Sequence, residues 1–136
     1  MIKLSTKWDY AMKSIIYLLK NKDSVIKISD ISSDLNISES LLRRIIASLH
    51  KSWIVYTKKW RNWWLSLWRD PKSISVYDVL FSVWEELWIS ECTKWNYCEN
   101  KDICFTTHIY WNIQKWLNGI LKLYTLDKFF IETDNE

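Results

Sequence analysis

Glycine and proline are nearly absent from this chain of 136 residues, which contains one of each. The sequence contains no motif of the phosphate-binding loops found in nucleotide-binding enzymes. There are only two histidines, and no nucleophile and base stand at a spacing typical of a catalytic pair. We therefore do not expect an enzyme.

Long apolar runs are missing as well. No stretch approaches the ~20 apolar residues that a membrane span requires, and the N-terminal residues lack the apolar core and cleavage site of a signal peptide. Hydrophobic residues still make up 49% of the chain, which is enough for a folded core at a length of one domain. The sequence predicts a globular cytoplasmic protein with no membrane partner.

Tryptophan is abundant where glycine is scarce: the chain has eleven tryptophans, whereas average composition predicts about nine or ten glycines at this length. Trp53 follows a predicted helix, at a place where a left-handed residue, usually glycine, is favoured. Trp60, Trp63 and Trp64 fall in a predicted tight turn where positive φ is common. We hypothesise that many of these tryptophans stand where the natural protein has glycine, because its source decodes UGA as glycine. The alternative is a genuinely tryptophan-rich protein, and the intact mass of protein from the native host distinguishes the two.

The apolar pattern predicts a mostly helical fold with a small β-wing. Apolar residues recur at helical spacing in five segments, and two short β-like runs flank a polar turn. We expect helices over residues 5–21, 28–35, 38–51, 74–83 and 103–124, a short strand over 25–27, ribbon strands over 54–58 and 65–67, and an irregular segment over 88–104.

Three helices followed by a ribbon is the order of a winged helix-turn-helix, in which the third helix enters a DNA major groove about 12 Å wide. Residues 41–72 carry eight lysines and arginines against one acid, Asp70, and this basic window coincides with the third helix and the wing. Residues 1–72 are therefore expected to form a region that binds double-stranded DNA. The expected contact residues are Ser38, Ser40, Arg43, Arg44, Lys58, Lys59, Arg61 and Asn62.

The three cysteines, Cys92, Cys98 and Cys104, are evenly spaced in the expected irregular segment. An odd count in a cytoplasmic chain argues against a disulfide framework. Three thiolates in one polar segment suit an iron–sulfur cluster or zinc, each of which needs a fourth ligand, and the lack of a C-x2-C pair favours iron–sulfur. His108, one turn after Cys104, is a candidate fourth ligand. The alternative is three reduced, unligated thiols.

Taken together, these motifs resemble the IscR/NsrR family of bacterial transcription regulators over nearly the whole chain. The matching stretches are residues 3–11, 28–31, 36–38, Leu42, 61–65, 70–71, 74–76 and the three cysteines. Members of this family typically have glycine at the positions of Trp8, Trp53, Trp60, Trp63 and Trp64. The resemblance therefore supports the glycine hypothesis independently.

The resemblance implies a homodimer packed along the long C-terminal helix. Residues 73–136 would form the cysteine-loop and dimerisation region, and the two DNA-binding heads would occupy a palindromic operator. The resemblance further implies a repressor that senses cluster status, redox state or nitric oxide through a 2Fe–2S or 4Fe–4S cluster at the three cysteines. Two alternatives stay open: a cluster-free regulator that senses redox state through its thiols, and a zinc-stabilised interaction module.

Two branches of the family imply different fourth ligands. In the iron–sulfur biogenesis regulators the ligand is a histidine three residues after the last cysteine, where this chain has Thr107 and places His108 one position later. In the nitric-oxide-sensitive branch it is an acidic residue near the N-terminus of the partner subunit, a position that matches Asp9. We favour Asp9, with His108 as the alternative.

Overall fold

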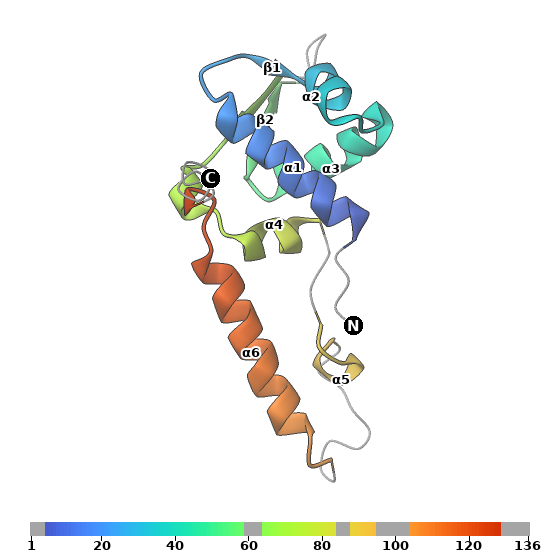
Figure 1. Ribbon diagram of the computed structural model, residues 1–136, viewed down its shortest axis with the longest axis vertical. Coiled ribbons are helices and arrows are strands. Elements are labelled where there is room, and N and C mark those ends of the chain that lie inside the picture. Colours follow the sequence, from blue (N-terminus) through green and yellow to red (C-terminus); the bar gives the residue numbers. More distant parts are fainter. Residues whose placement is uncertain (1–4, 59–63, 84–87, 95–103, 129–136) are drawn as a thin grey trace.

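The computed structural model describes residues 5–58, 64–83, 88–94 and 104–128 (Figure 1). Three helices and a small sheet form a head, a shorter helix lies against it, and one long helix extends away from it. The chain is mostly helical with a small antiparallel sheet, as the sequence predicts. None of the helices in these ranges is long and apolar enough to cross a membrane.

The head contains three helices, and the first and third of them begin at side-chain caps. The three helices are α1 (Thr6–Lys20), α2 (Ile28–Leu35) and α3 (Glu39–Lys51). The hydroxyl of Ser5 accepts a hydrogen bond from the backbone N–H of Trp8 at 3.2 Å, and the hydroxyl of Ser38 accepts one from the N–H of Leu41 at 3.2 Å. Each bond satisfies a backbone donor that has no partner within its own helix. All three predicted helices are confirmed, with ends that differ by a residue or so.

The sheet has three antiparallel strands in the order β1-β3-β2. They are β1 (Ile26–Lys27), β2 (Val55–Lys58) and β3 (Trp64–Leu67). β2 and β3 pair from Val55 opposite Leu67 to Lys58 opposite Trp64, which confirms the predicted ribbon. β1 joins this ribbon through Ile26 opposite Leu65, a pairing that the apolar pattern alone did not reveal.

A continuous hydrophobic core joins the head to the chain that follows it. α4 (Val76–Ser82) packs against α1, α3 and the long helix. It begins two residues later than predicted because Ser75 and Asp78 form a capping box, with bonds of 3.2 and 3.0 Å. The fully buried side chains include Ile15, Leu42, Ile45, Ile46, Leu49, Ile54, Ile74, Val79 and Leu126. Residues on both sides of the expected boundary at residue 72 therefore share this core.

The long helix α6 (Thr107–Leu123) is attached to the head at its C-terminal end. The N–H of Val76 donates to the carbonyl oxygen of Tyr124, and the N–H of Leu126 donates to that of Ile74, both at 2.9 Å. The N-terminal end of α6 is the end farther from the head (Figure 1). Residues 104–106 are coil and turn, so α6 begins later than the predicted residue 103.

Two short elements were not predicted. A 3-10 turn, η1 (Pro71–Ser73), follows β3, and a single helical turn, α5 (Glu91–Lys94), contacts α6. The prediction that residues 88–104 are irregular is wrong at α5. A helix of four residues is too short to show helical periodicity in the sequence.

Trp53 has the left-handed backbone conformation that the sequence predicts, with φ at 61°. Its N–H donates to the carbonyl oxygen of His50 at 3.1 Å, which closes the end of α3. Trp64 instead lies in β3, so its predicted place in the turn is wrong. Trp60 and Trp63 lie outside the described residues.

Candidate DNA interface and cysteine segment

The turn between α2 and α3 sets the angle at which α3 leaves the head. Asn36 is left-handed with φ at 53°, a conformation that asparagine tolerates, and its N–H donates to the carbonyl oxygen of Ser32. The hydroxyl of Ser32 also donates to the carbonyl oxygen of Ile37 at 2.6 Å. These local bonds hold the turn in one shape, so α3 is presented in a fixed orientation.

α3 has one buried and one exposed face. Its buried residues are Leu42, Ile45, Ile46 and Leu49, and the predicted contact residues Ser38, Ser40, Arg43 and Arg44 are all exposed. Arg43 forms an ion pair with Glu39 at 2.8 Å, and both side chains are about half exposed. Exposed pairs of this kind contribute little to stability. Arg43 can therefore exchange Glu39 for a phosphate or a base edge at small cost.

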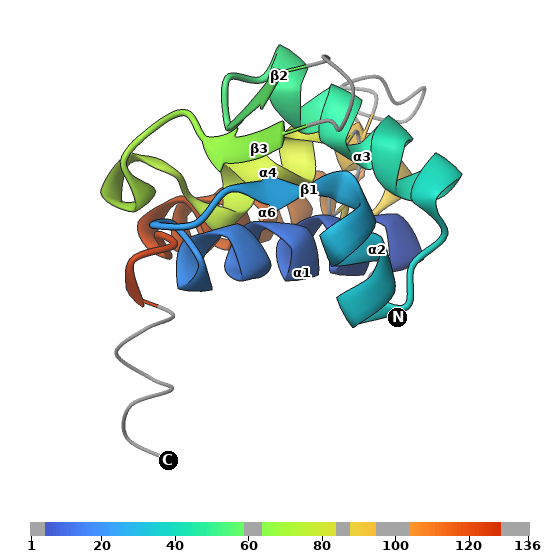
Figure 2. The ribbon, with the colours of Figure 1, turned by 90° about the horizontal axis from the view of Figure 1, so that it is seen from above.

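The wing, which contains β2 and β3, lies beside α3, because β2 packs against that helix (Figure 2). Lys58 is exposed at the last position of β2, opposite Trp64 of β3. Lys59, Arg61 and Asn62 lie outside the described residues. Every predicted DNA contact that lies within the described ranges is thus exposed on α3, at its N-cap or on the wing.

Two of the three cysteines lie in the described part of the chain as free, partly exposed thiols. Cys92 is in α5, with its Sγ 2.9 Å from the hydroxyl of Ser90. Cys104 precedes α6, with its Sγ 3.2 Å from the hydroxyl of Thr106. Hydrogen bonding to Thr106 favours the thiolate and lowers the pKa of Cys104 to about 7. Cys98 lies outside the described residues.

The two candidate fourth ligands lie on different helices. Asp9 is in the first turn of α1, where its carboxylate pairs with the Nζ of Lys13 at 2.8 Å and raises the pKa of that lysine. His108 is exposed in the first turn of α6. Within the described ranges, neither joins a group of three or more His, Cys, Asp or Glu side chains that could hold a metal. Thr107, where the resemblance implies a histidine, is buried, and its side chain helps to lower the pKa of the Cys104 thiol.

The helical spacing within residues 103–124 predicts an apolar stripe on α6, which the structure divides into two parts. The predicted stripe consists of Ile109, Ile113, Trp116, Leu117, Ile120, Leu121 and Tyr124. Leu121 and Tyr124 pack against the core of the head, so part of the stripe is covered within this chain. Ile109, Ile113, Trp116 and Ile120 of the stripe are exposed. Together with the exposed Leu123, which was not predicted, they form what we call the α6 apolar face. Trp116 is 70% exposed. A row of large exposed apolar side chains is typical of a binding surface.

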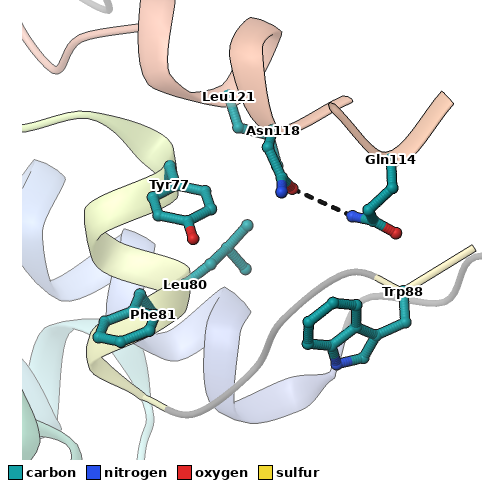
Figure 3. A pocket seen from close by; sticks show the side chains of 7 residues that line it. All are labelled: Tyr77, Leu80, Phe81, Trp88, Gln114, Asn118 and Leu121. Carbon is teal, nitrogen blue, oxygen red and sulfur yellow. Dashed lines mark hydrogen bonds between the residues drawn. The ribbon is translucent and has the colours of Figure 1, made fainter. Parts of the chain in front are cut away.

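A small cavity lies between α4, α6 and the segment before α5 (Figure 3). It is lined by Tyr77, Leu80, Phe81, Trp88, Gln114, Asn118 and Leu121. Gln114 is a residue that the sequence interpretation missed, although its side chain is buried. Nothing in the helical pattern distinguishes it from the polar residues on the surface of an amphipathic helix.

The sequence matches a known protein family over nearly its whole length. A family model described as "Rrf2: Iron-dependent Transcriptional regulator" matches residues 4–132. The chain is 27% identical to the HTH-type transcriptional regulator NsrR of Bacillus licheniformis, over 98% of this chain and 96% of that protein. It is 26% identical to the HTH-type transcriptional regulator IscR of Klebsiella pneumoniae, over 92% of this chain and 77% of that protein.

The fold is also found in a solved structure. CymR, described as the global cysteine regulator of B. subtilis, aligns with a TM-score of 0.75 and 20% identity, covering 95% of this chain and 96% of that one. At this identity the likeness shows the fold alone. It confirms the predicted winged helix-turn-helix with a long C-terminal helix.

Proposed function

The chain belongs to the Rrf2 family of transcriptional regulators, and on this premise we propose a homodimeric repressor controlled by an iron–sulfur cluster at Cys92, Cys98 and Cys104. Membership of the family makes the protein a DNA-binding transcription regulator and not an enzyme. The exposed basic face of α3 is the best support for the mode of DNA binding. The turn after α2 fixes the orientation of this helix.

DNA binding is proposed to use α3 and the wing together. Ser38 and Ser40 are exposed at the N-terminus of α3, where hydroxyls and backbone N–H groups suit phosphate oxygens. Arg43 and Arg44 point away from the buried face and are proposed to reach base edges in the major groove. Lys58, with Lys59, Arg61 and Asn62 of the wing, would contact the backbone and the adjacent minor groove.

The α6 apolar face is proposed to be covered by the same face of a second copy. Symmetric dimers use one patch on both subunits, so a single exposed stripe is sufficient. Burying Trp116 and Ile120 against their counterparts would remove large apolar side chains from water. Two heads joined in this way would occupy half-sites about 34 Å apart, which is one helical turn of DNA.

The described thiols fit the donor set of an iron–sulfur cluster. Cys92 and Cys104 are free and partly exposed, and thiolate sulfur is the ligand that such clusters prefer. A cluster, when bound, would supply a centre that reacts with oxidants and nitric oxide. The partner subunit's Asp9 is proposed to complete the site, with His108 as the alternative. Ligation by Asp9 would join the α1 helix of one subunit to the cysteine segment, residues 92–104, of the other.

Anaerobic purification followed by iron and sulfide assays tests the cluster. Duplexes selected from a random library by the iron-containing protein then serve as the DNA probe. We expect coloured protein that contains iron and sulfide and binds these duplexes at least tenfold more tightly than the cluster-free form does. Colourless protein without iron, or equal affinities of the two forms, would contradict the proposal.

A second candidate is a regulator that senses redox state through its thiols without iron. It is favoured by one observation, the pKa of Cys104 near 7, because a thiolate that is present at neutral pH reacts readily with oxidants. This candidate predicts a colourless protein whose DNA affinity changes on mild oxidation and loses that response in Cys104→Ser. The zinc-stabilised interaction module, which predicts no salt-dependent duplex binding, is not retained, because the family consists of transcriptional regulators.

A further inference from the structure

Gln114 is a polar side chain in an almost fully buried place, 3% exposed, near the middle of α6. Burying an amide is unfavourable unless it is hydrogen-bonded. Its Oε1 accepts from the backbone N–H of Ile89 at 3.0 Å. Its Nε2 donates to the Oδ1 of Asn118 at 3.0 Å (Figure 3). Gln114 therefore fastens α6 to a segment that lies 25 residues earlier in the chain.

The segment that Gln114 holds leads directly to Cys92. Thr93 is 1% exposed; its hydroxyl donates to the carbonyl oxygen of Ser90 at 2.7 Å and accepts from the Ser90 N–H at 3.3 Å. The same hydroxyl lies 3.4 Å from the Oε1 of Gln114, but its single proton is already used in the shorter bond. The hydroxyl of Ser90 in turn lies 2.9 Å from the Sγ of Cys92. Contacts thus run without a gap from the Cys92 thiol to Gln114.

A displacement of α6 near Gln114 would be transmitted to the DNA-binding head. Its C-terminal end is bonded to the start of α4 through Tyr124 and Leu126, and α4 packs against α1 and α3. Gln114 lies on the side of α6 away from Trp116 and Ile120, which are exposed. One face of the helix therefore contacts the cysteine segment, and another is free for a second copy.

We propose that Gln114 is a positioning residue that couples the ligand state of Cys92 to α6 and hence to DNA affinity. The inference rests on the proposed function, because it needs the cysteines to be the sensing site. α5 has only four residues, too few to be stable by itself, so the segment depends on contacts from outside it. A two-state response requires a group whose contacts differ between the states, and the bond between Gln114 and Ile89 is placed to be that contact.

Three variants test the proposal in the full-length protein. Gln114→Leu keeps the approximate side-chain size but removes the hydrogen bonds to Ile89 and Asn118. In Gln114→Glu, burial favours the protonated carboxyl group, which retains an acceptor for the Ile89 N–H and a donor for the Oδ1 of Asn118. Lys115→Leu is the matched control, because it makes the same kind of change at the neighbouring exposed position.

Iron and sulfide content and the ratio of cluster-bound to cluster-free DNA affinity are measured for each variant. For Gln114→Leu we expect a ratio at least fivefold smaller than wild type, or loss of iron although all three cysteines remain. Gln114→Glu and Lys115→Leu should keep wild-type values. Full iron content together with the wild-type ratio in Gln114→Leu would overturn the inference alone. If the cluster-bound and cluster-free forms of the wild-type protein bind DNA equally well, the proposed function itself is overturned.

Hydrogen exchange provides a measurement that does not depend on whether Gln114→Leu folds. In the wild-type protein the Ile89 amide should exchange at least tenfold more slowly than an unprotected amide, because its hydrogen bond to Gln114 must open first. Exchange of this amide at the unprotected rate, in both the cluster-bound and the cluster-free form, would overturn the inference.

Discussion

Arg69 donates a hydrogen bond from its Nε to the carbonyl oxygen of Trp53 at 3.2 Å, tying the chain after β3 to the turn that follows α3. Any residue at position 53 can accept this bond, because it uses only the backbone. The left-handed conformation of Trp53, by contrast, costs about 1–2 kcal/mol in a residue with a Cβ and almost nothing in glycine. Trp53 is 60% exposed, so burial offers little compensation, and its ring makes an edge contact with that of Trp68 at 4.5 Å between centroids.

The first prediction concerns this position. Trp53→Gly should be more stable than Trp53→Ala by about 1–2 kcal/mol, because both variants lose the ring and only alanine keeps the Cβ. Urea unfolding measures the difference. Ser52, with φ at −92°, is the control: there the alanine variant should be the more stable one, by about 0.5–1 kcal/mol. Equal or reversed stabilities at Trp53 would remove the structural support for glycine there.

The structure supports replacement by glycine to different degrees at the other tryptophans. The Nε1 of Trp8 is buried and has no hydrogen-bond partner among the described residues, which is unfavourable for an indole. Trp64 pairs within β3, where a side chain is accommodated and no positive φ is needed. The structure therefore favours glycine at Trp53. At Trp8 it disfavours the indole without requiring glycine, because Trp8 lies in α1 and has no positive φ, and at Trp64 it gives no reason for glycine.

The second prediction separates base reading from phosphate contact. Arg43→Ala should weaken binding to the selected duplex by about 1–3 kcal/mol and relax the sequence preference, if Arg43 reads a base edge. Lys58→Ala should weaken binding to all duplexes alike and lower the salt slope by about one. Titrations at several salt concentrations measure both effects. Unchanged affinity in both variants would contradict the proposed docking of α3 and the wing.

The third prediction concerns the α6 apolar face. Ile120 is exposed in the single chain, so Ile120→Asp should leave the fold intact but place an unpaired charge in the proposed dimer seam. Light scattering should show monomers, and operator affinity should fall because each head then binds alone. Lys115→Asp, on another side of α6, is the control and should stay dimeric. A dimeric Ile120→Asp would mean that the second copy binds elsewhere.

The fourth prediction concerns the Cys104 thiol in the cluster-free protein. The bond from Thr106 favours the thiolate and holds the pKa near 7, so Thr106→Val should raise that pKa toward the ordinary value of about 8.5. The rate of alkylation by iodoacetamide, followed against pH with Cys92 and Cys98 replaced by serine, measures it. Below pH 8 the variant should react more slowly. An unchanged midpoint would mean that Thr106 does not control this thiol.

The helical head could be predicted from the sequence because its signals are local. Ser38 caps α3 as expected, and the apolar spacing of Leu42, Ile45 and Leu49 defines the buried face. The division of the α6 stripe could not be predicted, because it depends on which residues the head covers. The burial of Gln114 depends likewise on a segment 25 residues away. No pattern within one helix contains that information.

The last prediction concerns the fourth cluster ligand. Asp9 lies on α1 and His108 on α6. Replacing each one in turn therefore shows which of the two helices is linked to the cluster. If the partner subunit's Asp9 is the ligand, Asp9→Ala should lose the visible absorption of the cluster under anaerobic conditions, and DNA binding should fall to the cluster-free level. His108→Ala should retain both.

Lys13→Ala is the matched control, because it breaks the same ion pair at 2.8 Å but leaves the carboxylate in place. It should keep the cluster, because this partly exposed pair is not needed to hold α1 together. If His108→Ala loses the spectrum while Asp9→Ala keeps it, His108 is the ligand, and the cysteine segment is then linked only to α6.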